Sequence, residues 1–299
     1  MSVNFSLMSQ DGPVLSLDDE PIFHRLLSRL LSARKVSCFT DRRAFQAEVQ
    51  RQIALQQLAC DILGDLIDAW RTDSVSLIQG VLDYWRSPNY VDMAMVAIID
   101  YRMPFETGLD VLANPILQAW KGRALLLTAH ADERVAVDAF NAGLIEQFVS
   151  KQAIAERPES IETRVRELQM AGNQDIELVW SSQMCHPTRA EVVTNASSLR
   201  ELYRQRGWTR HAVIGDPFGI LALTDRGDIE WFQLETKASL ATLAELWTMT
   251  GLGAEQGESI SRGEVIAAAN HVPGVTPFAL EPAQRVGSLY GAPYQIDLT

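Results

Sequence analysis

The sequence predicts an α/β protein in which a doubly wound, five-stranded parallel sheet is followed by a smaller α+β domain with an antiparallel meander. Short, nearly continuous apolar runs alternate with helical stretches in the first half, which is typical of a parallel sheet covered by helices on both faces. The pattern changes after about residue 171. A length of 299 residues fits two domains. We expect these domains at residues 1–171 and 172–299.

Five apolar runs are the expected strands of the first domain. They are residues 13–17, 35–40, 95–100, 124–130 and 145–151. A helix is expected from Pro21, because proline suits the first turn of a helix. The segment 159–170 is expected to be the last helix of the domain. Right-handed crossovers between such strands leave a doubly wound sheet as the simplest topology.

A long helical segment interrupts this alternation. Residues 41–94 separate the second run from the third, whereas a crossover needs only about 10–12 residues. Apolar residues at helical spacing predict one helix over 42–70 and a second over 74–86. We expect an insertion at about residues 54–92 that leaves the chemistry of the domain intact. Its apolar stripe is expected to pack on its own domain or on another subunit.

The second half has a different pattern. Residues 175–181 are expected to form a strand after a linker at 171–175, and residues 197–208 a helix. The segment 211–236 predicts a three-stranded antiparallel meander with tight turns at its Gly and Pro residues. A helix over 237–249 is expected to cover this meander. The second domain is therefore predicted to be α+β.

Composition and charge exclude several classes of function. No apolar stretch approaches the roughly 18 residues of a membrane span, so we expect no membrane association. The net charge of −12 argues against DNA binding, which needs clustered positive charge. The 3 cysteines and 5 histidines are scattered, which fits a reducing cytoplasm and predicts no zinc site.

Polar residues stand where four of the expected strands end. Asp18 and Asp19 follow the first strand, Asp100 and Thr128 end the third and fourth, and Lys151 ends the fifth. The carboxyl ends of parallel strands meet at one edge of the sheet. Three carboxylates there repel one another, and Mg²⁺ prefers such oxygen ligands. A carboxylate beside Mg²⁺ can attack a phosphoryl group, whose oxygens a hydroxyl and a lysine can then bind.

Four segments at these strand ends, VLSLDDEP, VAIIDYRMPFETGLDVL, LLLTAH and FVSK, resemble in this order the response-regulator receiver domain of two-component signalling. The resemblance runs from about Val14 to Met170, interrupted only by the insertion. It implies a sheet with the strand order 2-1-3-4-5. Two features depart from the family pattern: the helical insertion before the third strand, and Gln152, which stands where the family usually has proline.

The resemblance implies an acidic pocket that holds Mg²⁺ and accepts a phosphoryl group. Asp100 would be the phosphoacceptor. Asp18 and Asp19 would hold the metal ion, together with Asp100 and the backbone carbonyl of Arg102. The phosphoryl donor would be a sensor histidine kinase or a phosphotransfer protein, as in a phosphorelay.

The resemblance also implies the residues that respond to phosphorylation. Thr128 and Lys151 would bind the phosphoryl group. Thr128 and Phe148 would form the switch, in which rotation of the aromatic ring reports the phosphorylated state. Arg102 and His130 stand where the family tunes the lifetime of the acyl phosphate.

We therefore expect a cytoplasmic response regulator whose second domain binds a protein or a small ligand. Self-phosphorylation and autodephosphorylation would be its only enzymatic chemistry. A receiver-gated enzyme or nucleotide-binding module is an open alternative. A transcription factor is disfavoured, because the second domain has more acids than bases and contains a β-meander.

Two surfaces bear on the partners. The arginine face, by which we mean Arg200, Arg204, Arg206 and Arg210, is either a solvated helix face or a site that binds a nucleotide or phosphate. We also expect a homodimer, because receivers commonly signal through their last helix and strand and because the insertion offers apolar surface.

Overall fold

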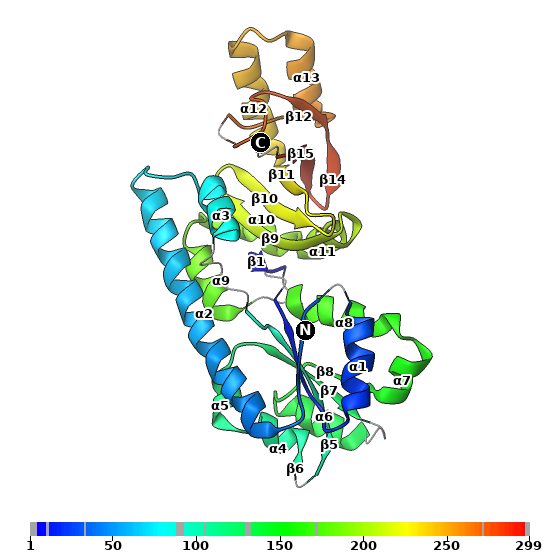
Figure 1. The fold of residues 1–299 in the computed structure, drawn as a ribbon. Coiled ribbons are helices and arrows are strands. Elements are labelled where there is room, and N and C mark those ends of the chain that lie inside the picture. Colours follow the sequence, from blue (N-terminus) through cyan, green and yellow to red (C-terminus); the bar gives the residue numbers. More distant parts are fainter. Residues whose placement is uncertain are drawn as a thin grey trace. The chain divides into compact units, whose positions relative to one another are not determined.

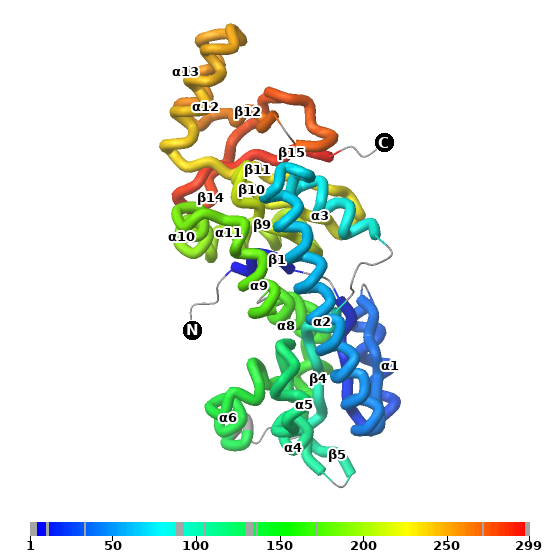
Figure 2. Tube along the Cα trace, turned by 90° about the vertical axis from the view of Figure 1, so that its left-hand side faces the viewer, coloured from blue at the N-terminus to red at the C-terminus, as the bar shows by residue number. Residues whose placement is uncertain are grey.

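The computed structural model describes residues 5–9, 12–32, 34–87, 93–104, 106–128, 133–170, 173–270 and 272–296. The chain forms two compact units (Figures 1 and 2). The N-terminal unit comprises residues 10–61 and 91–176, and the C-terminal unit comprises residues 1–9, 62–90 and 177–299. The predicted boundary at 171/172 lies close to the last of these divisions. Residues 1–9 and 62–90, which were expected in the first domain, group with the C-terminal unit. As independently folding domains, the predicted ranges stay a prediction.

A five-stranded parallel sheet is the centre of the N-terminal unit. Its order is β3-β2-β4-β7-β8, which is the predicted order 2-1-3-4-5, and the fold class is confirmed. The strands are β2 (Val14–Leu17), β3 (Val36–Phe39), β4 (Val96–Asp100), β7 (Arg123–Thr128) and β8 (Gln147–Ser150). Leu17 lies opposite Ile99, and Ile99 lies opposite Leu126. The register therefore brings the carboxyl ends of the central strands to the same edge.

Helices cover both faces of this sheet, because alternate side chains of a strand point to opposite faces. Leu15 and Ile99 belong to the core on one face, and Val14 and Ile98 to the core on the other. The first face is covered by α2 (Arg42–Arg71), α4 (Gly108–Leu112), α5 (Pro115–Ala119) and α6 (Glu133–Asn141). The second face is covered by α1 (Pro21–Leu30), α7 (Lys151–Glu156) and α8 (Glu159–Met170). Burial on both faces is the reason that the central strands β2 and β4 are mostly apolar.

The predicted insertion contains the second part of α2 and all of α3 (Leu77–Arg86). The two helices pack closely at Gly80, where a Cβ atom would lie 2.2 Å from Cδ1 of Leu66. Helix α3 also packs against β9 (Trp208–Gly215) of the same unit, and its residues Leu77, Val81 and Leu82 are buried. The apolar stripe of the second helix is therefore covered by its own chain.

The C-terminal unit is built on a six-stranded antiparallel sheet with the order β1-β9-β10-β11-β15-β14. Strands β9, β10 (Phe218–Thr224) and β11 (Ile229–Glu235) form the predicted meander. Strand β1 (Met8–Ser9) pairs with β9 although some two hundred residues separate them in the sequence. The other strands are β14 (Gln284–Val286) and β15 (Leu289–Gln295), while β12 (Val265–Ala267) and β13 (Leu280–Pro282) form a separate ribbon.

The helices of the C-terminal unit are α9 (Gln174–Ser181), α10 (His186–Thr194), α11 (Ala196–Gln205), α12 (Lys237–Met249) and α13 (Ala254–Arg262), in addition to α3. Helices α11 and α12 confirm the two helices predicted for this half. No helix in the described part of the chain has both the length and the apolar character that a membrane span requires.

The prediction of a strand at 175–181 is wrong, because this segment is helix α9. Ile176 and Trp180 are buried one helical turn apart, whereas Leu178 between them is 74% exposed. Asn173 accepts hydrogen bonds from the backbone N–H groups of Asp175 and Ile176 and so begins the helix. Part of the expected linker at 171–175 is therefore a helix cap.

Candidate functional site at the carboxyl edge of the parallel sheet

The structure brings the predicted polar residues together at one edge of the parallel sheet. Strand β2 ends at Leu17 and Asp18 follows directly, while β4 and β7 end at Asp100 and Thr128. Lys151 begins α7 directly after β8. Since neighbouring strands are parallel and in register, their ends converge, and a crevice for a ligand is expected at such an edge.

Lys151 is the cation of this site. Its Nζ lies 2.7 Å from Oδ2 of Asp18, 3.1 Å from Oδ1 of Asp100 and 3.6 Å from Oε2 of Glu20. The side chains of Asp18 and Asp100 are only 1% and 5% exposed. The ammonium group also lies 4.6 Å from the ring centroid of Phe23, where the aromatic face attracts a cation. One lysine therefore pairs with two buried carboxylates.

The charge of Asp100 is incompletely compensated. Burial raises the pKa of Asp100 to about 6, although the charge and hydrogen bond of Lys151 act in the opposite direction. Burial also acts to lower the pKa of Lys151, but its hydrogen bonds and ion pairs with Asp18 and Asp100 outweigh this effect and raise that pKa. The lysine therefore stays protonated at neutral pH, and an additional cation would stabilise the ionised form of Asp100.

The carboxylates of Asp18, Asp19 and Asp100 form an acidic cluster. One ligand oxygen from each lies within 4.8 Å of the others. Carboxylate oxygens in such a group suit Mg²⁺, and the raised pKa of Asp100 fits a site that requires more positive charge. The backbone N–H of Arg102 donates a hydrogen bond to the Asp100 carboxylate. The predicted role of the Arg102 carbonyl as a metal ligand stays a prediction.

The loop after Asp100 is shaped by a glycine. Strands β5 (Arg102–Met103) and β6 (Glu106–Thr107) form a short ribbon that turns the chain back toward the end of β4. A Cβ atom at Gly108 would lie 2.2 Å from the carbonyl oxygen of Asp100 and 2.9 Å from the side chain of Ile99. Only glycine fits at the start of α4 without displacing the backbone of the acidic residue.

The remaining predicted site residues have different surroundings. Thr128 is buried, as a hydroxyl at the end of a central strand would be. Phe148 is half-buried in β8 and packs against the core on the α4 side. Gln152, in place of the family's proline, lies in the first turn of α7. His130 lies outside the residues that the structure describes. The roles predicted for Thr128 and Phe148 as a switch stay predictions.

Three residues next to the acidic cluster were missed at the level of sequence. Glu20 and Phe23 contact Lys151, and His24 is buried nearby. Burial lowers the pKa of His24, while the charge of Asp18 acts in the opposite direction. Their position in the sequence could have indicated them, because all three lie within the first turns after Asp18 and Asp19.

Two residues of the arginine face pair with carboxylates of the same unit. Arg206 forms an ion pair with the buried Glu230, and Arg204 lies 3.3 Å from a carboxylate oxygen of Glu201. These contacts are what a structural or solvated helix face would have. The alternative of a nucleotide or phosphate site stays a prediction.

No family model matches the sequence, and no curated protein is similar to it in sequence. Among solved structures, the response regulator LqsR of Legionella pneumophila is similar over 99% of this chain and 90% of its own, with a TM-score of 0.66 and 18% identity. An adenylate cyclase of Rhodopirellula baltica covers 58% of this chain and 94% of its own, with a TM-score of 0.35 and 20% identity. The chemotaxis protein CheY4 of Vibrio cholerae covers 52% and 98%, with 0.33 and 18%.

The similarities to the adenylate cyclase and to CheY4, with TM-scores of 0.35 and 0.33, are too weak to carry an argument. The similarity to LqsR covers nearly the whole chain and extends over both of its units. This chain therefore has the fold of LqsR, and its five-stranded parallel sheet has the strand order that the sequence motifs predict.

Proposed function

We propose that the protein is a response regulator of a two-component system in which Asp100 accepts a phosphoryl group from a histidine kinase or a phosphotransfer protein. The observation that supports this proposal is the position of Asp100. Its buried carboxylate lies at the end of a central strand, 3.1 Å from the ammonium group of Lys151 and close to the carboxylates of Asp18 and Asp19. A nucleophile, a charge partner and a set of metal ligands are thus close together.

The residues of the site would divide the chemistry among them. With a pKa of about 6, Asp100 is mostly ionised at neutral pH, so a carboxylate oxygen can attack the phosphorus atom while the bond to the donor imidazole breaks. Mg²⁺ held by Asp18, Asp19, Asp100 and the Arg102 carbonyl would offset the charge of the incoming phosphoryl oxygens. Lys151 would hold one of those oxygens in place of the carboxylate oxygen it contacts at 3.1 Å.

The output would follow from the rearrangement of Thr128 and Phe148 once the phosphoryl group is bound. The C-terminal unit would then bind a protein or a small ligand, without DNA binding. The predicted homodimer rests on the last helix and strand of the receiver. The second helix of the insertion does not contribute to it, because its apolar stripe packs within its own chain.

The test is phosphorylation of the full chain with acetyl phosphate and Mg²⁺, followed by intact-mass spectrometry. We expect one added phosphoryl group on the wild type and none on Asp100→Asn. Asp65→Asn removes an exposed carboxylate of α2 and is the matched control, which should be phosphorylated like the wild type. A chelator such as EDTA should abolish the reaction. Equal phosphorylation of the wild type and Asp100→Asn would contradict the proposal.

A further inference from the structure

Helix α12 is apolar on two opposite sides. Ala244 and Trp247 are buried against the rest of the C-terminal unit, but Leu246 and Met249 are 52% and 83% exposed. Only 2 of the 13 residues of this helix, KASLATLAELWTM, are charged. A helix that packs on one side against its own protein normally presents charged residues on the other side. The exposed side of α12 therefore has the composition of a contact surface.

The exposed apolar residues gather at the end of a helix pair. Leu246 and Met249 lie one turn apart on α12, and Leu252 follows in the connection to α13, 46% exposed. We call these three residues the apolar tip. The indole N–H of Trp247 donates to the carbonyl of Gly253 at 3.1 Å and fixes the connection. In both views α12 and α13 lie side by side and extend beyond the six-stranded sheet (Figures 1 and 2).

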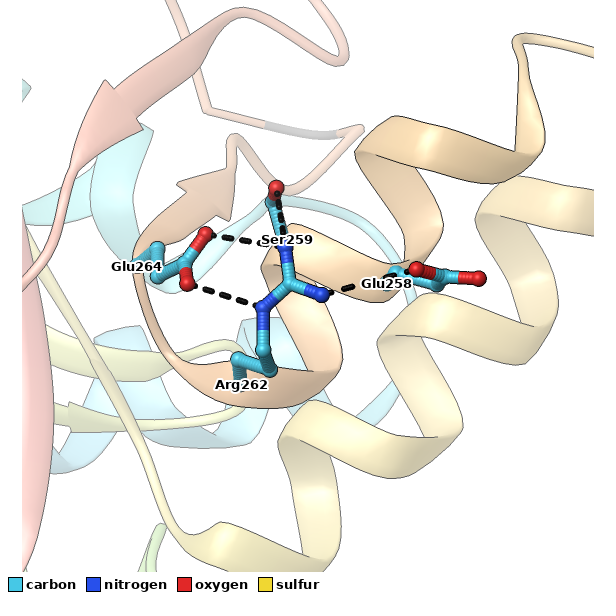
Figure 3. Close-up of polar contacts among 4 residues, drawn as sticks. All are labelled: Glu258, Ser259, Arg262 and Glu264. Atoms are coloured by element: carbon cyan, nitrogen blue, oxygen red, sulfur yellow. Dashed lines mark hydrogen bonds and ion pairs between the residues drawn. The ribbon is translucent and has the colours of Figure 1, made fainter.

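The charge around the apolar tip is negative. Glu245 and Glu255 are exposed next to it, and neither forms an ion pair with any residue that the structure describes. The one arginine of α13, Arg262, turns to acidic neighbours of its own: its Nε lies 2.8 Å from Oε1 of Glu264, and its Nη1 lies 3.4 Å from Oε2 of Glu258 (Figure 3). The only other base of the helix pair is the first residue of α12, at the opposite end. The apolar tip is thus bordered by uncompensated carboxylates.

We propose that the apolar tip binds a partner protein that presents an apolar surface bordered by lysine or arginine side chains, as one side of a basic amphipathic helix does. Charge decides between this partner and a second copy of the chain, because two tips facing each other would oppose carboxylate to carboxylate. The same carboxylates disfavour an anionic membrane. Three side chains are far fewer than the roughly 20–30 residues per side of a standard stable interface, so the contact is reversible.

This surface goes beyond phosphorylation of Asp100, and its test does not depend on that reaction. The probe is a fluorescently labelled synthetic helix with leucine on one side and lysine on the other, and its binding to the full chain is measured by fluorescence anisotropy. A peptide with glutamate in place of lysine is the comparison. We expect the lysine peptide to bind and the glutamate peptide to bind much more weakly.

Two variants locate the binding site. The double variant Leu246→Ser/Met249→Ser keeps the charge of the protein and should weaken binding of the lysine peptide about tenfold or more, because two apolar side chains lose their contact. The control is Leu178→Ser, which alters a side chain that is 74% exposed on α9 of the same unit and should bind like the wild type. Glu245→Lys/Glu255→Lys should abolish the preference for the lysine peptide.

Other results would overturn the proposal. If the double variant and Leu178→Ser bind the lysine peptide as the wild type does, the attraction is only that of an acidic protein for a basic peptide. If sedimentation shows a wild-type dimer that the double variant loses, the occupant is a second copy. If phosphatidylcholine vesicles bind the wild type but not the double variant, the occupant is a membrane. Unchanged urea unfolding of each variant establishes that it is folded.

Discussion

Both units bury polar and charged side chains, but they use them in different ways. In the N-terminal unit, the carboxylates of Asp18, Asp19 and Asp100 lie close together at one sheet edge, and one ammonium group, that of Lys151, pairs with both Asp18 and Asp100, so the negative charge is incompletely compensated. In the C-terminal unit, Glu177 and His211 are separate and hydrogen-bond to the segment 5–9. Charges that are incompletely compensated are typical of groups that take part in chemistry or bind ions. Buried polar groups whose hydrogen bonds are satisfied hold distant segments of the chain together.

The largest effect is expected from deletion of residues 1–9, which tests whether the buried polar groups of the C-terminal unit stabilise it by holding this segment. The deletion takes away β1 and the buried side chains of Phe5 and Met8, and it leaves Glu177 and His211 without their partners. Each apolar side chain contributes about 1.5–3 kcal/mol and each unpaired polar group costs about 1–3 kcal/mol, so we expect the free energy of unfolding to fall by about 5 kcal/mol or more.

Urea unfolding followed by tryptophan fluorescence measures this loss, because six of the 7 tryptophans belong to the C-terminal unit. The proposed phosphorylation of Asp100 is the internal comparison, and we expect it to persist at low urea. An unchanged unfolding midpoint would show that the segment 5–9 does not stabilise the C-terminal unit.

Substitution of Glu177 tests how much one buried carboxylate contributes to holding the segment 5–9. Its carboxylate accepts hydrogen bonds from the backbone N–H groups of Leu7 at 2.8 Å and Met8 at 3.3 Å, and from the hydroxyl of Ser6. Glu177→Ala should lower the free energy of unfolding by about 2–4 kcal/mol, because the buried donors lose their acceptor. Glu177→Gln keeps one acceptor oxygen and should lose less. Equal losses in the two variants would mean that side-chain volume, and not hydrogen bonding, is responsible.

Gly108 tests the site of the N-terminal unit. The Cβ atom of Gly108→Ala would meet the carbonyl of Asp100, and we expect a loss of about 1–3 kcal/mol together with slower phosphorylation by acetyl phosphate. The control is Gly64→Ala in the interior of α2, where an added Cβ atom has no neighbour within 4 Å. That change should stabilise by up to about 1 kcal/mol. A Gly108→Ala protein as active and stable as the wild type would remove the steric argument.

The smallest expected effect is the contribution of His211 to the pH dependence of the free energy of unfolding. Burial lowers its pKa to about 4, whereas in an unfolded chain it is about 6.5. Between these values the unfolded chain binds a proton that the folded chain does not, so stability present above pH 6.5 is lost as the pH falls toward 4. At pH 5.5 the loss is about 1 kcal/mol.

The measurement is the difference in free energy of unfolding between the wild type and His211→Gln at pH 7 and pH 5.5. The difference between variants is needed because burial raises the pKa of Glu177, which acts in the opposite direction. We expect the advantage of the wild type to shrink at the lower pH. A pH-independent difference would contradict the shifted pKa of His211.

The acidic cluster was predictable from the sequence because the geometry of a parallel sheet relates distant residues. Once four apolar runs are assigned as parallel strands, Asp18, Asp100, Thr128 and Lys151 must lie at one edge, whatever the length of the crossovers. Glu20 was not predicted, because its contact with Lys151 depends on the side-chain conformations at the start of α1.

The C-terminal unit was less predictable, because its contacts join segments that no local pattern connects. The helical periodicity of residues 74–86 shows that one side is buried, but it does not say against which core. Strand β1 has two residues, too few to show any alternation. At 175–181, a buried Ile176 and Trp180 with an exposed Leu178 between them were mistaken for a strand.

The order of the segments along the chain limits how this protein can be recombined. The C-terminal unit is assembled from residues 1–9, 62–90 and 177–299, so an N-terminal unit transplanted as the contiguous segment 12–176 would carry 62–90 away from β9. Buried side chains of α3 such as Val81 and Leu82 would then face water, and aggregation is the expected result. To transplant the N-terminal unit, residues 62–90 have to be excised and replaced by a short connection.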